Sequence, residues 1–197
     1  MQKSLALGGV LGGLVLFVWG VVSYMVLPWH TAVLSKFADE AAVARALTAN
    51  TLASGMHILP NPHKVEPGMT EAHRQAAEED GVKRMMQGPF MFASVGLTGA
   101  RDMGQAMGLN VLGNILSATL VTWLLLQTSA RSYWGRVGFV VVLAFTTCTI
   151  AYVPYWIWWN FSTGFTLVEF ADHVIGWFLV GLVLTKFATL PSPLARS

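Results

Sequence analysis

Three ionisable side chains stand near the start of one apolar segment, residues 165–187, FTLVEFADHVIGWFLVGLVLTKF. Glu169 and His173 are four residues apart, so on a helix they share one face. That spacing suits two ligands of one metal ion, or a carboxylate and an imidazole that share a proton. His30 in LPWH and His57 in GMHILP are the further candidates to complete a site for a divalent metal.

The same side chains have a structural interpretation, which the sequence favours. Thr166 and Glu169 have the spacing of a capping box at the start of a helix. On that interpretation Glu169 acts mainly as a helix cap, while Asp172 and His173 are hydrogen-bonded within the outer mouth of a helix bundle. The sequence contains no HExxH, Walker, dinucleotide-binding, haem-attachment or serine-elbow motif. It therefore predicts no cofactor, with a divalent metal as the open alternative.

A second polar row follows Asn110, Asn114 and Ser117, which share one face of a helix. Because unpaired amides are costly in lipid, this face is expected to pack against another helix; a polar pathway is the alternative. Four glycines in residues 5–27 form two overlapping GxxxG pairs that favour close helix approach, within the chain or with a partner: Gly8, Gly9, Gly12 and Gly13.

The composition indicates a chain whose solvent is lipid. Hydrophobic residues make up 54% of the chain and charged residues only 11%, against roughly 25% charged in soluble domains. The net charge of +2 gives no reason to expect a nucleic-acid partner. The single cysteine, Cys148, cannot form a disulfide within the chain.

Four windows are long and apolar enough to cross a bilayer, which takes about 20 residues. They cover about 5–27, 107–127, 137–158 and 167–187. The sequence therefore predicts an all-α integral membrane protein with four transmembrane helices in a single domain, residues 1–197.

The basic residues predict the orientation of these helices. Five of them lie at the chain ends and in the short 128–136 loop: Lys3, Arg131, Arg136, Lys186 and Arg196. Because short cytoplasmic loops are enriched in Lys and Arg, both termini are expected in the cytoplasm of a bacterial inner membrane. The 28–106 segment is then outside.

The 28–106 segment predicts a small outer cap. An amphipathic helix is expected within 35–50, and a charged helix within 70–86 with Thr70 as its N-cap. GMHILP (55–60) and GPFMFASVGLTG (88–99) are expected to pair as a short β-ribbon.

The chain resembles small bacterial integral membrane proteins of uncharacterised function that carry four helices. The resemblance rests on FVWGVVSYMVLPWH (17–30), SGMHILP (54–60), GPFMF (88–92) and FTLVEFADHVIGWFLVGLVL (165–184). It implies the topology and no activity.

The leading functional hypothesis is a non-enzymatic accessory or assembly subunit of a larger inner-membrane complex, whose partners are lipid and other membrane subunits. The alternative is a small transporter or a metal- or proton-handling protein that uses the polar groups at the outer mouth. A membrane enzyme with a metal held by Glu169, His173 and His30 is the third hypothesis.

The orientation can be tested by thiol labelling. A Cys148→Ala variant that carries either Lys64→Cys or Ser132→Cys is treated with a membrane-impermeant thiol reagent. We expect labelling of position 64 in intact cells and of position 132 only after lysis. The reverse pattern would exclude this orientation.

Overall fold

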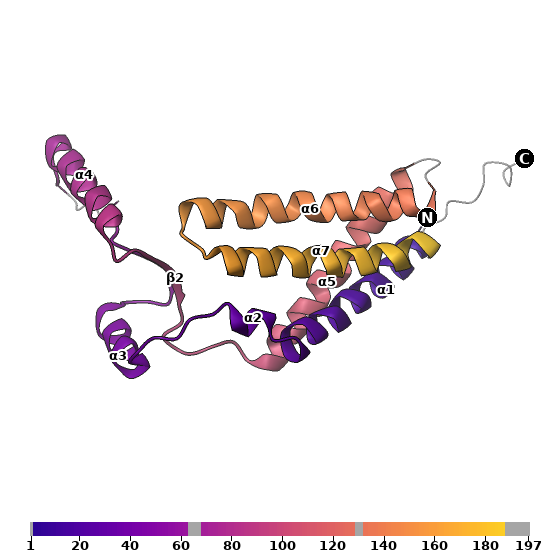
Figure 1. Ribbon diagram of the computed structural model, residues 1–197, viewed down its shortest axis with the longest axis horizontal. Coiled ribbons are helices and arrows are strands. Elements are labelled where there is room, and N and C mark those ends of the chain that lie inside the picture. The colour runs from indigo at the N-terminus through magenta and orange to yellow at the C-terminus, as the bar shows by residue number, and fades with distance from the viewer. Residues whose placement is uncertain (1, 63–67, 129–131, 188–197) are drawn as a thin grey trace, which may run out of the picture. The chain divides into compact units, whose positions relative to one another are not determined.

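The computed structural model describes residues 2–62, 68–128 and 132–187, and most of them are helical (Figure 1). Four helices are long and apolar enough to cross a membrane. They are α1 (Gln2–Val21) with the π-helical turn η1 (Val22–Val26), α5 (Met103–Gln127), α6 (Tyr133–Trp158) and α7 (Thr163–Phe187). The four predicted apolar helices are thus confirmed.

The chain separates into two compact units. Residues 1–35 and 101–197 form the helical unit, which holds the four long helices and the short helix α2 (Trp29–Ala32). Residues 36–100, most of the predicted outer cap, form a unit of their own.

The last three long helices begin about four residues before their predicted starts. Each begins after a residue whose side chain accepts a hydrogen bond from a first-turn amide: Asp102 for α5, Ser132 for α6 and Ser162 for α7. Hydropathy windows begin where side chains become apolar, whereas the helical backbone begins at its cap. This difference explains the late predicted starts.

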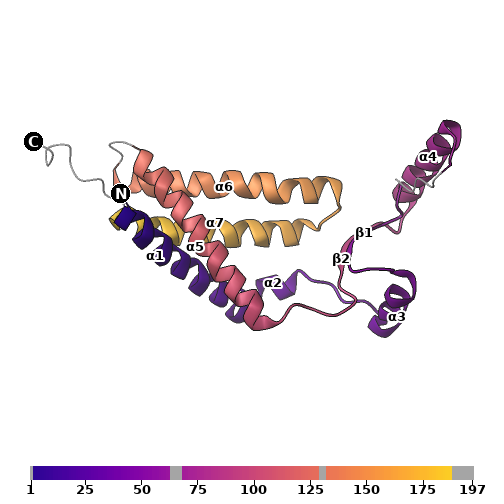
Figure 2. The ribbon, with the colours of Figure 1, turned by 180° about the vertical axis from the view of Figure 1, so that it is seen from behind.

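Two helix pairs make up the helical unit. Helices α6 and α7 lie antiparallel, joined by residues 159–162, and α1 lies along α5 in the views of both Figure 1 and Figure 2. Helix α1 also contacts α7, which links the pairs. Figure 1 shows the pairs meeting near the end of α7 and diverging toward its start.

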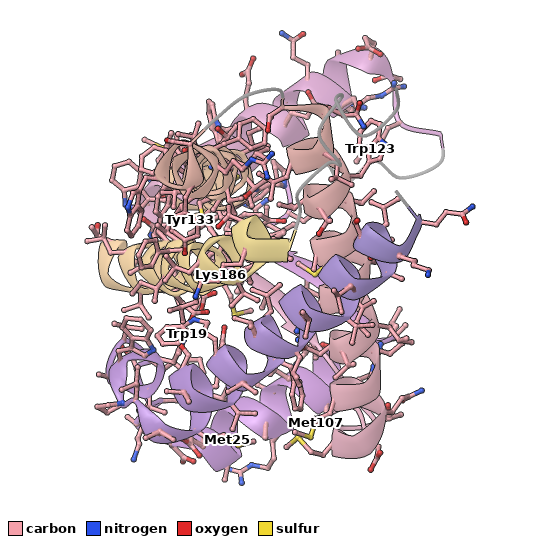
Figure 3. The ribbon with its side chains drawn as sticks, turned by 90° about the vertical axis from the view of Figure 1, so that its right-hand side faces the viewer. Trp19, Met25, Met107, Trp123, Tyr133 and Lys186 are labelled. Carbon is pink, nitrogen blue, oxygen red and sulfur yellow. The ribbon has the colours of Figure 1, made fainter. Side chains whose placement is uncertain are left out.

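The apolar core lies where the pairs meet. It is built from Leu125 and Leu126 of α5, Val140 and Ala144 of α6, and Trp177, Val180 and Leu184 of α7. The phenol of Tyr133 fixes the same end, because it donates a hydrogen bond to the carbonyl of Leu182 at 2.9 Å. Figure 3 shows Tyr133 beside α7.

The glycines of α1 are used within the chain. A Cβ atom on Gly13 would lie 2.9 Å from the backbone of Ile115 on α5, and one on Gly12 would lie 2.8 Å from the Cβ of Ala118. Gly8 and Gly9 meet the side chains of two threonines of α5 in the same way. Of the two predicted uses of this glycine stripe, the structure therefore shows the intramolecular one.

The 36–100 unit contains the predicted ribbon and both predicted helices. Strand β1 (Gly55–Leu59) pairs antiparallel with β2 (Met91–Val95), with His57 opposite Ala93. Helix α3 (Glu40–Asn50) is capped by the side chain of Asp39. Helix α4 (Glu71–Gln87) is capped by Thr70, as predicted.

The contact between α1 and α5 predicts different responses at two glycines of one helix. Gly13→Ala should lower the free energy of unfolding by about 1–3 kcal/mol, because its new methyl group meets backbone that cannot rotate away. Gly20→Ala is the matched control, since nothing lies within 4 Å of a Cβ at Gly20. Thermal unfolding in detergent, followed by tryptophan fluorescence, measures both variants. Equal midpoints would contradict this account of the contact.

Candidate functional site

The polar site begins with a change of helix type at the end of α1. In η1 the amide of Leu27 bonds to the carbonyl of Val22, five residues back, at 3.0 Å. Such π-helical turns are frequent at functional sites. Pro28, which has no N–H to extend the helix, then leads into α2. As a result Ser23 and His30, seven residues apart in the chain, are both buried and in contact.

We call the side chains around this turn the His30–Glu169 cluster; its members are Ser23, Tyr24, Trp29, His30 and Glu169. The imidazole of His30 is 7% exposed and lies between two partners. Its Nε2 is 3.0 Å from the Ser23 hydroxyl, and its Nδ1 is 3.3 Å from a carboxylate oxygen of Glu169. The Tyr24 ring stacks on the imidazole with centroids 3.7 Å apart, and its hydroxyl donates to the Glu169 carboxylate at 3.4 Å.

The donors in this cluster determine the order of its protons. The Trp29 indole N–H donates to the Ser23 hydroxyl oxygen at 3.0 Å. An ionised carboxylate only accepts hydrogen bonds, so the Nδ1 atom of His30 that faces Glu169 carries a proton. The proton on Nδ1 then points at Glu169. The chain of hydrogen bonds runs from Trp29 through serine and histidine to the carboxylate.

Serine, histidine and a carboxylate in this order also occur in hydrolases, but the surroundings here do not suit nucleophilic attack. Ser23 is 0% exposed, so a substrate carbonyl has no access to its oxygen. The cluster instead joins the end of α1 to α7. Sequence reasoning missed Ser23 and Tyr24, because their contacts with His30 depend on the π-helical turn and carry no motif.

Glu169 does not cap its helix, and that prediction is wrong. Helix α7 begins at Thr163, so Glu169 lies in its second turn, beyond the free first-turn amides. Thr166 is also inside the helix, where its hydroxyl donates to the carbonyl of Ser162 at 3.1 Å. The cap is Ser162, whose hydroxyl accepts from the amide of Phe165 at 3.2 Å.

Asp172 and His173 lie further along α7 and have different surroundings. The Thr147 hydroxyl donates to the carbonyl of Ala144 at 2.8 Å, so its oxygen accepts from Nε2 of His173 at 3.2 Å. Asp172 receives no comparable contact. Its Oδ1 atom is buried and has no hydrogen-bond partner among the residues that the structure describes. The nearby Trp19 indole donates to the backbone carbonyl of Asp172 at 3.0 Å, not to its carboxylate.

A cavity of about 260 Å³ adjoins these two residues between α1, α5 and α7. Asn110, Asn114 and Ser117 line its α5 side, so the predicted polar row does share one face. The Asn114 amide donates to the Asn110 side-chain oxygen at 2.9 Å, along the helix. The row therefore faces a polar cavity as well as its neighbouring helices.

The four predicted metal ligands are brought together only in part. His30 and Glu169 are in contact, whereas His173 bonds to α6. His57 belongs to the 36–100 unit, where its ring bonds the carbonyl of Ala53 at 3.1 Å. Across residues 2–62, 68–128 and 132–187, no group of three or more His, Cys, Asp or Glu side chains is placed to hold a metal ion.

Comparison with known proteins identifies no relative: no protein-family model, curated protein or solved structure matches the chain.

The buried contact between Glu169 and His30 predicts a stabilising role for this carboxylate. Its side chain is 14% exposed, so Glu169→Ala should leave the His30 N–H unpaired and cost roughly 1–3 kcal/mol of unfolding free energy. Glu169→Gln should cost less, because the amide oxygen still accepts a hydrogen bond. Glu71→Ala is the control. The Glu71 side chain is 82% exposed, so its ion pair with Arg74 should contribute less than about 0.5 kcal/mol to stability. Chemical unfolding in mixed micelles measures all three. Equal losses at positions 169 and 71 would exclude a buried pair.

Proposed function

We propose that this chain is a multi-pass protein of the bacterial inner membrane that serves as a non-enzymatic accessory or assembly subunit of a larger membrane complex. One observation carries the proposal: the described residues of the 36–100 unit, 36–62 and 68–100, contain no buried apolar core. A segment without a buried apolar core needs the surface of another protein to be stable. Four helices able to cross a membrane supply the anchor for such a role.

The exposed side chains of the 36–100 unit support the proposal that another protein binds it. In its described residues, 36–62 and 68–100, only Pro62 and Gly81 are buried. Its exposed large apolar side chains are Phe37, Leu52, Met56, Leu59, Val82, Met86 and Leu97. Domains of this size normally fold around a buried apolar core, and their stability depends on it. These side chains are therefore available to another protein.

The ribbon suggests how a partner would bind. A two-stranded sheet is marginally stable in water. Among the strands that the structure describes, β1 and β2 pair with each other alone, so each presents an outer edge of backbone donors and acceptors. Exposed apolar side chains at Met56 and Leu59 lie on β1. A strand of a partner subunit added at this edge would extend the sheet, and its side chains would lie beside Met56 on one face and Leu59 on the other.

The glycine stripe of α1 is not the partner surface. Its four glycines are buried against α5 and α7, so no second protein can use them. Intersubunit contact is accordingly assigned to the 36–100 unit. The proposed orientation, with both termini in the cytoplasm and this unit outside, rests on the basic residues of the short loops.

Site-specific photocrosslinking in living cells tests the partner role. A photoreactive phenylalanine analogue replaces Met56 on β1 in one variant and Leu116 on α5 in the other. The two native side chains are matched in exposure, at 60% and 61%. We expect the Met56 variant to give a discrete adduct with another membrane protein, identified by mass spectrometry. The Leu116 variant should give no protein adduct, because its side chain faces lipid.

Two outcomes would contradict the proposal. Absence of any protein adduct at position 56 would leave the 36–100 unit without a partner. An adduct with a second copy of this chain would replace the accessory role by self-assembly.

A further inference from the structure

The cavity between α1, α5 and α7 combines polar and aromatic walls. Its volume of about 260 Å³ is a little below the range of ~300–1,000 Å³ typical of ligand sites, so it suits a small solute. Amide and hydroxyl groups line its α5 side, and Asp172 and His173 line its α7 side. This is a different set of residues from the His30–Glu169 cluster, except that Tyr24 belongs to both.

An acidic side chain, Asp172, lines the cavity. Within the described part of the chain, the buried Oδ1 atom of Asp172 has no hydrogen-bond partner, and no lysine or arginine lines the cavity. His173 is its neighbour in sequence, but adjacent residues of a helix do not face each other, and its Nε2–H is donated to Thr147. A carboxylate inside a chain of this hydropathy is expensive unless a cation accompanies it. The missing positive charge can come from a ligand.

Aromatic rings form much of the remaining wall. Trp19 of α1, Tyr24 of η1 and Trp177 of α7 all line the cavity. Trp19 lies directly over Gly176, where a Cβ atom would come within 2.8 Å of the indole ring. Figure 3 shows Trp19 in the space between α1 and α7. Rings of tryptophan and tyrosine attract cations through their faces, and most strongly when water is excluded.

We infer that this cavity is a binding site for a small organic ammonium ion, with the Asp172 carboxylate as its counter-charge and the rings of Trp19, Tyr24 and Trp177 around its alkyl groups. Asn110, Asn114 and Ser117 provide the polar contacts for any hydroxyl or N–H that the ligand carries. The inference concerns a ligand and does not depend on the proposed partner role.

The wall chemistry favours this class of ligand over others. An anion would meet Asp172 with no basic side chain to bind it. A compact metal ion needs several oxygen or nitrogen ligands to replace its water, whereas one carboxylate and three aromatic rings suit a large, weakly hydrated cation. An uncharged solute would leave the carboxylate uncompensated.

Choline and its uncharged isostere, 3,3-dimethylbutan-1-ol, test the inference on the purified full-length chain in detergent. The two probes have nearly the same shape and differ in charge. We expect choline to raise the midpoint of thermal unfolding and to change the tryptophan fluorescence, since Trp19 and Trp177 line the site. The isostere, and sodium chloride at equal concentration, should do neither.

Two variants and one control identify the residues. Asp172→Asn keeps the shape of the side chain and should weaken choline binding at least about tenfold, a difference of about 1.4 kcal/mol. Without ligand the same variant should unfold at a higher temperature, because it removes an unpaired charge whose Oδ1 atom is buried. If the carboxylate served only to stabilise the fold, the variant would instead unfold at a lower temperature. Trp19→Leu should also weaken choline binding. Asp80→Asn, on the exposed face of α4, is the control and should leave binding unchanged.

The inference is overturned if the isostere or sodium chloride gives the same shift as choline. It is also overturned if neither choline nor tetramethylammonium shifts the wild-type chain, or if Asp172→Asn binds choline as tightly as the wild type. Should Asp172→Asn fail to fold, the comparison of choline with its isostere on the wild-type chain, together with Trp19→Leu, still decides the question.

Discussion

The close approach of α1 to α5 and α7 is the contact on which the helical unit depends. Helices in lipid gain little from the hydrophobic effect, so they associate through dense van der Waals packing between surfaces without bulky side chains. The glycine stripe of α1 provides such a surface, and Ile115 and Ala118 of α5 lie directly against it. This packing fixes the direction of α1. It therefore also fixes where Trp19, near the end of α1, meets the backbone of Asp172 on α7.

The divergence of the two helix pairs separates apolar from polar packing. Where the pairs meet, Leu125, Val140 and Leu184 fill the space between them. Toward the start of α7 the pairs move apart (Figure 1), and the interior there is occupied by hydrogen-bonded side chains and a cavity. Polar groups can be tolerated at that end because the wider spacing gives each of them room for a partner, a ligand or water.

The long helices and the ribbon could be predicted from the sequence, whereas the His30–Glu169 cluster could not. Long apolar runs predict helices by themselves, and the aromatic-rich segment 88–99, bounded by Gly88 and Gly99, predicts a strand that pairs with 55–60. The contact between His30 and Glu169 depends on a π-helical turn and on the approach of α7, neither of which has a local signature. Glu169 was misassigned for a related reason: the spacing to Thr166 fits a capping box, but the helix begins earlier, at a serine cap.

The order of the helices along the chain has a consequence for biosynthesis. The glycine stripe of α1 is translated first, whereas the residues that cover it come much later: Ile115 and Ala118 on α5, then Leu184 near the end of α7. Until those residues have been synthesised, the packing surface of α1 stays bare. A chain truncated before α5 would keep that surface uncovered. Synthesis of α7, which contributes Val180 and Leu184, completes the surface that covers Gly12.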